Sequence, residues 1–406
     1  MKLIKKSTIS SISTPGLLDS HQYFQPKKFV FINIASNSNI MVVGILRSSN
    51  SPIAPLVPEI GKKYVKHDYK VMMEEDCGVQ AHFPDIAYFE VGVSIHSTSD
   101  ILKSADIILT DSAIDAEQIK QAKEEAIIIG RFNPLVNTEF VKSLQSERRK
   151  FFSLDMVPRS SIAQSMDILS SLASLSGYKA VVLAAEKYAG YFPMMSTAAG
   201  TVPPAKVLVL GAGVAGLQAI ATARRLGAVV EAFDVRSAVK EEVQSLGARF
   251  IEVEGSKEDT GAGGYAVQQS DEYIKKQKQL IHERALNADI VITTANIPGK
   301  KAPLLIEKRT VESMKSGSVI IDLASASGGN CEFSEEGKVV WVEDVMIIGN
   351  SKLYESAPKE ASRLYSTNLY NFTKFLFKEG IDKLPMDHEI VKKTLLNQSE
   401  LVSANN

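Results

Sequence analysis

The chain has 406 residues, of which 45% are hydrophobic and 23% are charged, and its formal net charge is −1. This composition is typical of a globular protein with two domains, and the near-neutral charge excludes the basic character of proteins that bind nucleic acid or anionic membranes. The two cysteines, Cys77 and Cys331, have no metal-ligand spacing, so we expect buried thiols in a reducing compartment and no metal site.

The first 40 residues differ in composition from the rest. They contain five lysines, seven serines and a single acidic residue, Asp19. An extension without a fold explains this composition. A targeting segment is the alternative, although no clean apolar region is followed by a cleavage signal. Met41 opens the first apolar run and is a candidate start of the chain.

Short apolar runs alternate with longer helix-like segments from residue 41 onward. Most runs lack polar–apolar alternation, which indicates strands buried on both faces of a parallel sheet. The expected strands are 41–46, 69–75, 106–110, 126–130, 151–155, 206–210, 229–233, 249–254, 289–294, 318–323 and 345–349. A final long helix is expected over 358–380.

This order predicts an α/β protein with two doubly wound, Rossmann-like domains. We expect an extension over 1–40, a first domain over 41–170 completed by 360–390, a second domain over 171–359 and a C-terminal tail over 391–406. The junction is expected near Gly177. The longest apolar stretch, Val207–Ala223, contains three glycines and a glutamine. It therefore fits a strand followed by a helix better than a membrane span.

The stretch VPRSSIAQSMDILSS, residues 157–171, is polar for the start of an apolar helix. If it is helical, Gln164, Asp167 and Ser170 lie on one face at i, i+3 and i+6, just after Arg159. A solvent-exposed helix face and a ligand site both explain this pattern. The residues alone leave the two interpretations open.

The segment AKVLVLGAGVAGLQAIATARR carries a glycine motif between an apolar strand and a helix. Its glycines, Gly211, Gly213 and Gly216, have G-x-G-x-x-G spacing. Gly211 allows the tight turn, Gly213 lets the backbone approach a pyrophosphate, and Gly216 lets strand and helix pack closely. The helix N-terminus supplies free N–H groups to the phosphates. The motif in this context predicts a dinucleotide site in the second domain.

The strand after this helix ends at Asp234, 23 positions after Gly211. A carboxylate at this position accepts hydrogen bonds from ribose hydroxyls and repels a 2′-phosphate, which favours NAD(H) over NADP(H). Arg236 complicates this prediction, because a nearby arginine can serve a 2′-phosphate.

A long charged segment follows the strand expected at 249–254, and it is glycine-rich around Gly264 and Tyr265. A solvent-exposed loop explains it. A lid with an aromatic tip over a binding site is the alternative.

Residues 150–380 resemble the NAD(H)-binding α component of proton-translocating NAD(P)⁺ transhydrogenase, and residues 41–150 resemble it more loosely. The matching motifs are RSSIAQSMD, GAGVAG, GGYA, ITTANIPGKKAPLLI, MKSGSVIIDLAS, GGNCE and RLYSTNLYNF. Alanine dehydrogenases are related, but RSSIAQSMD and GGYA match the transhydrogenase pattern better.

The resemblance implies roles for particular residues. It implies that Arg159, Gln164 and Asp167 hold the nicotinamide end of the cofactor and aim its ring, which makes them the candidate catalytic residues. The remaining cofactor-binding candidates are Ser160, Ser161, Ile162, Ser165, Met166, Gly211, Gly213, Val214, Gly216, Asp234, Val235, Arg236, Gly264, Tyr265, Gln277 and Asn296.

The chain departs from the family pattern in several places. GILRSSNSPIAPLVPE lacks the family's E-x-R-V-A type segment, and DLASASGGN lacks a polar or acidic residue usual before GGN. VQQ lies two to four residues after Tyr265, where the family often has methionine, and Asn296 replaces a leucine. These differences leave open a changed affinity or a degenerate paralogue.

The histidines give a further indication about the reaction. An amino-acid dehydrogenase moves a proton with the hydride and needs a general acid or base. None of the six histidines aligns with the catalytic histidine of alanine dehydrogenases, and TDSAIDAEQ, at the end of the strand that closes at Thr110, lacks their lysine. Hydride passage between two nicotinamides needs only rings held face to face with water excluded. The sequence therefore favours direct transfer from NADH to NADP⁺.

The resemblance also implies partners. NADP(H) would sit on a separate component, a membrane component would carry the protons, and the chain would form a homodimer. It would be a cytoplasmic subunit, peripheral at the inner membrane through its partners, with organellar targeting by residues 1–40 left open. Two alternatives remain: an alanine-dehydrogenase-like NAD oxidoreductase, and a non-catalytic, degenerate NAD-binding paralogue.

Overall fold

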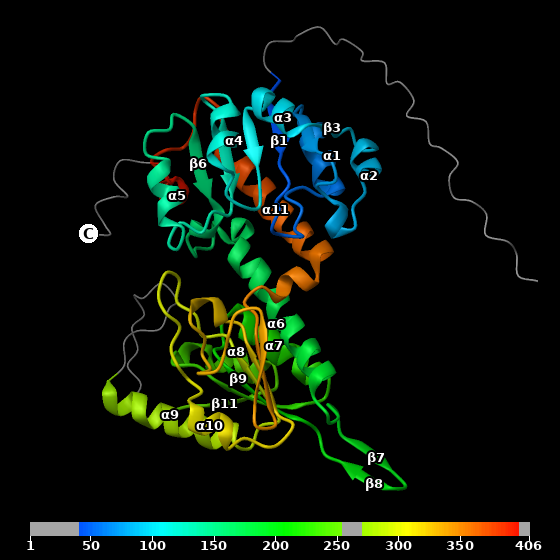
Figure 1. Cartoon of the computed structure of the whole chain (residues 1–406), viewed down its shortest axis with the longest axis vertical. Helices are drawn as coiled ribbons and strands as arrows, with labels where there is room; N and C mark the ends of the chain where they lie inside the picture. The colour runs from blue at the N-terminus through cyan, green and yellow to red at the C-terminus, as the bar shows by residue number, and fades with distance from the viewer. Residues whose placement is uncertain (1–39, 254–269, 398–406) are drawn as a thin grey trace, which may run out of the picture. The chain divides into compact units, whose positions relative to one another are not determined.

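The computed structural model describes residues 40–253 and 270–397, which form two parallel sheets with helices around them (Figure 1). The first sheet has the order β3 (Ser94–His96), β2 (Lys70–Glu74), β1 (Val42–Ile45), β4 (Ile107–Leu109), β5 (Ile127–Gly130), β6 (Lys150–Ser153). The second has the order β11 (Arg249–Ile251), β10 (Val229–Phe233), β9 (Lys206–Leu210), β12 (Ile290–Thr293), β13 (Val319–Asp322), β15 (Val345–Gly349), β14 (Lys338–Val342). All neighbours are parallel except β14, which is antiparallel to β15. The predicted α/β class is confirmed.

Twelve α-helices accompany these strands within the described residues. They are α1 (Pro58–Lys66), α2 (Asp85–Phe89), α3 (Thr98–Ser104), α4 (Ala116–Gln121), α5 (Thr138–Ser143), α6 (Ile168–Lys187), α7 (Val214–Arg225), α8 (Lys240–Ser245), α9 (Asp271–Ala285), α10 (Lys308–Glu312), α11 (Pro358–Leu376) and α12 (Glu389–Thr394).

Both sheets are covered on two faces because alternate strand residues point to opposite sides. In β4, Ile107 and Leu109 pack in the cluster that contains residues of α1 and α11, whereas Ile108 packs with residues of α3 and α4. In β9, Val207 and Leu208 divide in the same way between α7 and α9. Continuous apolar strands therefore give a doubly wound fold. Burial of each such side chain contributes roughly 1.5–3 kcal/mol.

Helix α6 belongs to two hydrophobic clusters. Its first turns contribute Ile168 and Leu172 to the cluster of the first sheet, and its later turns contribute Ala180 and Ala184 to the cluster of the second. It is also the one described helix with the length and hydropathy to cross a membrane. Its buried residues pack in these two clusters. The stretch Val207–Ala223 is instead β9, the glycine turn and most of α7, as predicted.

Gly177, expected near a domain junction, lies inside α6 and contacts α7. A Cβ atom at this position would lie 2.1 Å from the carbonyl oxygen of Ala215, a backbone atom in the first turn of α7. The glycine therefore lets the two helices approach closely.

We predict that Gly177→Ala destabilises the protein. The added methyl group must push α7 away from α6, and overpacking of this kind costs about 1–3 kcal/mol. Denaturant unfolding measures the change, with Ser174→Ala on the same helix as the control. Equal stability of Gly177→Ala and the wild type would show that the two helices separate without cost.

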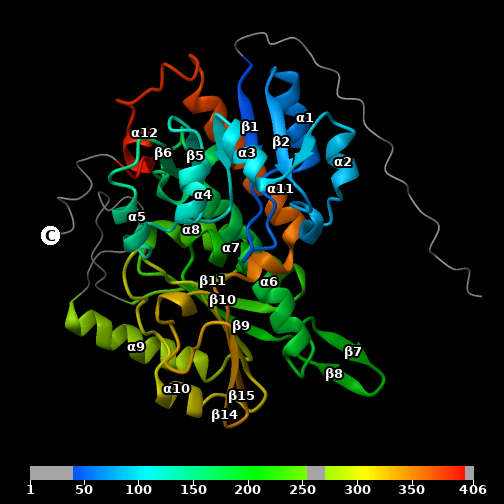
Figure 2. The same ribbon diagram turned by 45° about the horizontal axis from the view of Figure 1, so that its top comes forward.

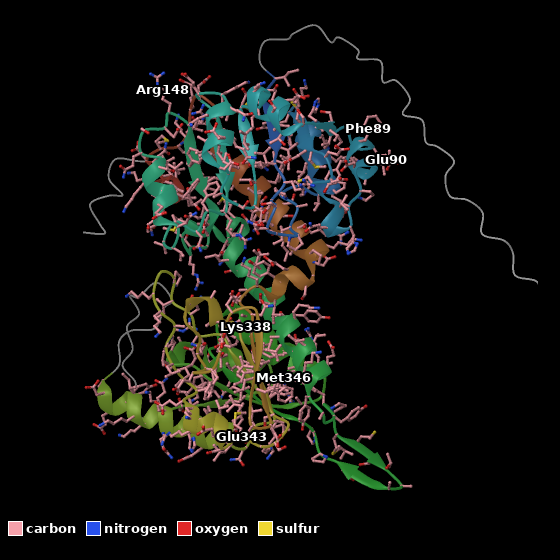
Figure 3. The ribbon with its side chains drawn as sticks, in the orientation of Figure 1. Phe89, Glu90, Arg148, Lys338, Glu343 and Met346 are labelled. Carbon is pink, nitrogen blue, oxygen red and sulfur yellow. The ribbon has the colours of Figure 1, made fainter. Side chains whose placement is uncertain are left out.

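The sequence pattern did not predict β3, β14 or a hairpin of β7 (Met195–Thr197) and β8 (Gly200–Val202). β3 and β14 are edge strands. β3 (SIH) has no continuous apolar run, whereas β14 (KVVWV) does have one. Figure 3 shows Lys338 at the start of β14, Met346 on β15 and Glu343 in the turn between them. Glu343 has a φ of +48°, which accounts for the sharp reversal.

The end of the described chain lies against β6. Leu395 forms an antiparallel bridge with Phe152, and the backbone N–H of Leu396 donates to Phe151 O at 2.8 Å. The side-chain amide of Asn397 donates to Arg149 O at 2.6 Å. Figure 2 shows α12 beside this strand. Residues 391–397, expected to begin a tail, are thus tied to the first sheet.

Candidate functional site

The glycine turn lies between β9 and α7, at the carboxyl end of a central strand. Gly211 has a φ of +98°, a conformation that favours glycine. Its N–H donates to Phe233 O at 2.8 Å, and its carbonyl accepts from Thr294 Oγ1 at 2.9 Å. The turn is therefore fixed by the strands on both sides of β9, where the strand order reverses. Ligands of open α/β sheets bind at such positions.

Gly216 and Gly213 are required for different reasons. A Cβ atom at Gly216 would lie 1.8 Å from Gly211 O, so the fold itself excludes a side chain there. A Cβ atom at Gly213 would meet nothing within 4 Å, and the φ of Gly213 is −80°. Nothing in the described chain requires a glycine at position 213. A ligand lying against the backbone would supply that requirement.

The N-terminus of α7 faces the same space. Helix α7 begins at Val214, and Gly213, its N-cap residue, has no side chain to accept from the first backbone N–H groups. These N–H groups and the positive end of the helix dipole favour an anion. Val214 is 41% exposed, so the approach to the turn is open. The residues fit the pyrophosphate of a dinucleotide.

Asp234 follows β10 and is only 9% exposed. One carboxylate oxygen, Oδ2, accepts from the N–H of Ala212 at 2.8 Å, which ties the acid to the glycine turn. Arg236 donates to both oxygens, from its N–H and Nε to Oδ1 at 2.9 Å and from Nη2 to Oδ2 at 2.8 Å. The hydrogen bond to Asp234 raises the pKa of the Arg236 guanidinium. The Asp234 carboxylate is therefore bound by the Arg236 guanidinium. The position of Asp234 at the end of the strand did not predict this ion pair.

The polar segment 157–171 is not a continuous helix. Residues 164–166 form a 3₁₀ turn, η3 (Gln164–Met166), and α6 begins only at Ile168. Asp167 is the N-cap of α6: Oδ1 accepts from Ser170 N at 2.9 Å and Oδ2 from Ser170 Oγ at 2.6 Å. The expected helix face of Gln164, Asp167 and Ser170 is therefore wrong. A short acidic side chain that binds the N–H three residues on favours a helix start over a helix interior.

One side of this segment is buried against the protein, and the other side is exposed to solvent. Ala163 and Met166 are buried, and the carbonyl of Ser165 accepts from the side-chain amides of Asn368 and Asn371, each at 2.9 Å. The exposed members of the candidate set are Arg159, Ser160, Ser161, Ile162, Gln164 and Ser165. Ile162 is 69% exposed, which is unusual for a large apolar side chain in a well-anchored segment. The segment presents side chains to solvent from a rigid base.

Helix α6 links the two candidate segments. Asp167 caps its start, and Gly177 contacts Ala215 in the first turn of α7. Ten residues of helix correspond to a rise of about 15 Å. The polar segment and the glycine turn are thus attached to one rigid element.

The remaining candidates lie in several places. Val235 is partly buried after β10, Gln277 is 8% exposed on α9, and Asn296 is exposed after β12. Gly264 and Tyr265 lie outside the described residues, so the expected lid stays a prediction.

Two buried residues support the site and were not predicted as members of it. The amide of Asn330 accepts from Ala295 N at 3.0 Å and donates to Ala295 O and Pro303 O, each at 2.8 Å. Asp322 holds Asn330 in turn, because its Oδ2 accepts from Asn330 N at 2.7 Å. Together they fix the loop after β12. The motif GGNCE contains Asn330, but a sequence cannot show which carbonyls an amide will reach.

A buried ion pair lies at the carboxyl ends of β4 and β5. Arg131 Nη2 is 3.0 Å from Asp111 Oδ2, and Arg131 Nη1 donates to the hydroxyl of Tyr354 at 2.6 Å. Burial raises the pKa of Asp111, although the Arg131 charge opposes the shift. Because the guanidinium is already engaged, this end of the first sheet does not present it to a carboxylate substrate.

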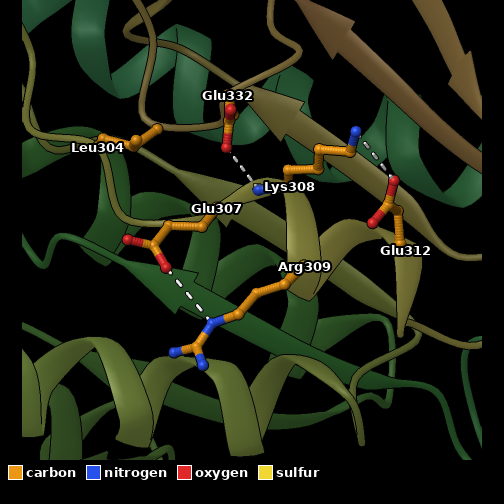
Figure 4. A pocket seen from close by; sticks show the side chains of 6 residues that line it. All are labelled: Leu304, Glu307, Lys308, Arg309, Glu312 and Glu332. Atoms are coloured by element: carbon orange, nitrogen blue, oxygen red, sulfur yellow. Dashed lines mark hydrogen bonds and ion pairs between the residues drawn. The ribbon is translucent and has the colours of Figure 1, made fainter.

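A shallow hollow of about 370 Å³ lies beside α10 (Figure 4). Its charged groups satisfy one another: Lys308 is 3.7 Å from Glu312, and Arg309 is 3.4 Å from Glu307. Lys308 N also donates to Glu332 at 2.6 Å. The charged groups of the hollow are thus partly paired with one another. No His, Cys, Asp and Glu cluster suited to a metal ion occurs in the stretches of the chain that the structure describes.

Comparisons with known proteins cover both sheets. Residues 49–176 match the family described as "Alanine dehydrogenase/PNT, N-terminal domain", and residues 180–404 match "Alanine dehydrogenase/PNT, C-terminal domain". The chain is 44% identical to the NAD(P) transhydrogenase subunit alpha of Haemophilus influenzae, over 86% of this chain and 69% of that protein. It is 43% identical to an NAD(P) transhydrogenase subunit alpha chain of Rickettsia prowazekii, over 86% of this chain and 92% of that one. An alanine dehydrogenase of Methanococcus maripaludis is 24% identical, over 72% and 74%.

Solved structures give the same pattern. A transhydrogenase from Sinorhizobium meliloti matches with a TM-score of 0.79 and 42% identity, over 87% of this chain and 97% of that one. An L-alanine dehydrogenase matches with a TM-score of 0.72 and 21% identity, over 87% and 94%. The second match shows likeness of fold alone.

Proposed function

The chain belongs to the alanine dehydrogenase/PNT family, and from this premise we propose that it is the NAD(H)-binding component of a proton-translocating NAD(P)⁺ transhydrogenase. The observation that carries the proposal is the glycine turn, where Gly213 has open space and α7 presents uncapped N–H groups. Identities of 42–44% to transhydrogenases, against 24% to an alanine dehydrogenase, support the choice of reaction.

The residues of the chain would divide the work of holding NADH. The glycine turn and α7 would bind the pyrophosphate, and Asp234 would accept from the adenosine ribose hydroxyls. Arg159, Gln164 and Asp167 would orient the nicotinamide end, from a segment anchored by Ala163 and Met166. When bound, the cofactor supplies the hydride. The protein contributes orientation and exclusion of water, and the reaction requires no general acid or base.

The proposal includes the partners that the resemblance to transhydrogenase implies. NADP(H) would be held on a second component, and proton movement would take place in a membrane component. The chain would then act in the cytoplasm at the membrane surface, attached through those partners.

We also propose that the chain forms a homodimer through the hairpin β7–β8. All residues of both strands are exposed, including Met195 and Val202, and Met194 before them is 66% exposed. An isolated two-stranded hairpin is marginally stable in water, so a second copy covering it would account for its apolar residues.

Light scattering measures the oligomeric state. We predict twice the monomer mass for the wild type and a lower apparent mass for Met194→Asp/Met195→Asp. The control is Val339→Asp on the exposed edge strand β14. A monomeric wild type, or an unchanged mass in the double variant, would contradict the hairpin interface.

The proposed function is tested by reconstitution. The protein is mixed with a transhydrogenase NADP(H)-binding component, and transfer from NADPH to an NAD⁺ analogue is followed by absorbance. Transfer supports the proposal. NADH binding without transfer would favour a non-catalytic paralogue, and NADH oxidation with pyruvate and ammonia would favour an alanine dehydrogenase.

We predict that Asp234→Ala narrows the preference for NADH over NADPH by about tenfold or more. The wild-type carboxylate would face a 2′-phosphate across a few ångströms. Removing the carboxylate abolishes that repulsion. It also leaves the Arg236 guanidinium without the carboxylate to which it donates in the wild type. Calorimetric titration of both cofactors measures the ratio, with Glu241→Ala on α8 as the control. Equal affinities of the wild type for NADH and NADPH would contradict the prediction.

A further inference from the structure

A second cavity, of about 550 Å³, lies among the end of α1, η3 and α11, away from the glycine turn. Its volume is within the range of small-molecule sites. We name it the α1–α11 pocket. The side chains used below are Tyr64, Tyr69, Tyr370, Asn371, Lys374 and Lys378, which all line it.

The walls of the α1–α11 pocket are aromatic and held in place. The Tyr64 ring lies edge-to-face against Tyr69 at 5.5 Å and against Tyr370 at 5.1 Å. The Tyr64 hydroxyl donates to Thr373 Oγ1 at 3.0 Å, which fixes the central ring. Burial raises the pKa of all three phenols, so they carry no charge at neutral pH. A flat ring would find rigid, apolar partners here.

The rim of the pocket is basic. Lys374 and Lys378 line it, and Lys63 Nζ lies 5.5 Å from the centre of the Tyr370 ring. The residues that line the pocket include no carboxylate. None of these three lysines takes part in an ion pair within residues 40–253 and 270–397. The rim of the pocket therefore carries lysine charges that no ion pair among the described residues engages.

From the aromatic walls and the unpaired lysines together, we propose that the α1–α11 pocket binds a small ligand with a planar ring and an anionic group. The ring lies against Tyr69 and Tyr370, with the buried Tyr64 packed behind them, and the carboxylate or phosphate lies at Lys374 and Lys378. Charge attraction in a partly enclosed, aromatic cavity is stronger than at an open surface. The pocket contains no residue of the glycine turn, although Ser165 and Met166 in its wall are also cofactor-binding candidates.

The pocket also touches the polar segment. Ser165 and Met166 contribute to its wall, and the side-chain amide of Asn371 donates to Ser165 O at 2.9 Å. A ligand in the pocket would therefore contact Ser165 and Met166, the two residues between Gln164 and Asp167.

The position of Lys374 in the last turn of α11 gives it a structural role as well, because cations stabilise helix C-termini. Lys103 occupies the same kind of position in α3 and does not line the α1–α11 pocket. Lys103→Gln is therefore the matched control for Lys374→Gln.

The test is a titration of the full-length protein with 1-naphthyl phosphate, in the presence of saturating NADH to occupy the proposed cofactor site. We expect saturable binding, weakened about tenfold or more by Lys374→Gln/Lys378→Gln and by Tyr370→Leu. Lys103→Gln should bind like the wild type. 1-Naphthol, which lacks the charge, and inorganic phosphate, which lacks the ring, should each bind more weakly than the probe.

Three results would overturn the proposal. They are the absence of saturable binding, an equal loss of affinity in Lys103→Gln, and unchanged affinity in the double lysine variant. Thermal unfolding of each variant separates loss of the site from loss of the fold, because the lysines are exposed and their removal should leave the unfolding temperature nearly unchanged.

Discussion

Gly213→Ala is expected to abolish most NADH binding while leaving the protein at least as stable as the wild type. The backbone at Gly213 has a φ of −80°, which alanine adopts without strain, and a Cβ atom there meets nothing within 4 Å. Replacing glycine by alanine at such a position stabilises a protein by about 0.4–1 kcal/mol. A cofactor phosphate lying against the same backbone would collide with the methyl group. We expect the dissociation constant for NADH to rise on the order of 100-fold.

Gly216→Ala provides the contrast. Its Cβ atom would lie 1.8 Å from Gly211 O, so α7 must move away from β9 and the fold itself is damaged. We expect this variant to lose both stability and NADH binding. Arg225→Ala, at the far end of α7, should lose neither. Calorimetric titration with NADH and thermal unfolding without it separate the three outcomes. If Gly213→Ala binds NADH as the wild type does, no ligand lies against that turn.

The second sheet was largely predictable because its signals are local. β9, β10 and β15 occupy the predicted residues, since continuous apolar runs leave few alternatives to a buried strand. The glycine turn was predictable because two of its glycines have a local cause, a positive φ at Gly211 and a close approach at Gly216. The edge strand β3 was not, because SIH contains no apolar run, and β14 was missed although its sequence, KVVWV, is such a run.

Contacts between distant residues were beyond the reach of the sequence pattern. Asn330 reaches Ala295 and Pro303 across a loop, and nothing local distinguishes it from an exposed asparagine. Gly177 shows a weaker form of the same limit. A glycine inside an apolar helix indicates close packing, but only the fold shows that α7 is the neighbour.

The polar segment illustrates a wrong choice between two local rules. Helical spacing placed Gln164, Asp167 and Ser170 on one face, whereas the capping preference of aspartate places the helix start at Asp167. The structure follows the second rule. As the N-cap of α6, the Asp167 carboxylate accepts hydrogen bonds from the backbone N–H and the hydroxyl of Ser170. These bonds fix the orientation of the carboxylate before any ligand binds.

Gln164→Asn and Asp167→Asn are each expected to slow hydride transfer far more than they weaken NADH binding. The glycine turn and Asp234 should provide most of the binding, and the polar segment should mainly fix the position of the nicotinamide ring. An interaction that matters mostly in the transition state changes the rate and barely changes the dissociation constant. Misplacement by about 1 Å costs on the order of 100-fold in rate. Transfer in the reconstituted system and NADH titration of each variant measure the two effects.

The cap provides the controls that separate a structural role from a positioning role. Asparagine is as good an N-cap as aspartate, so Asp167→Asn should keep the start of α6, whereas Asp167→Ala should lose about 1 kcal/mol of stability. Asp115 caps α4 in the same way, with Oδ1 accepting from Gln118 N at 2.8 Å. Asp115→Asn is therefore the same chemical change at a site remote from the polar segment, and it should transfer hydride at the wild-type rate. If Asp167→Asn transfers hydride at the wild-type rate, Asp167 acts only as a helix cap. If Gln164→Asn loses NADH binding, the polar segment contributes to affinity as much as the glycine turn does.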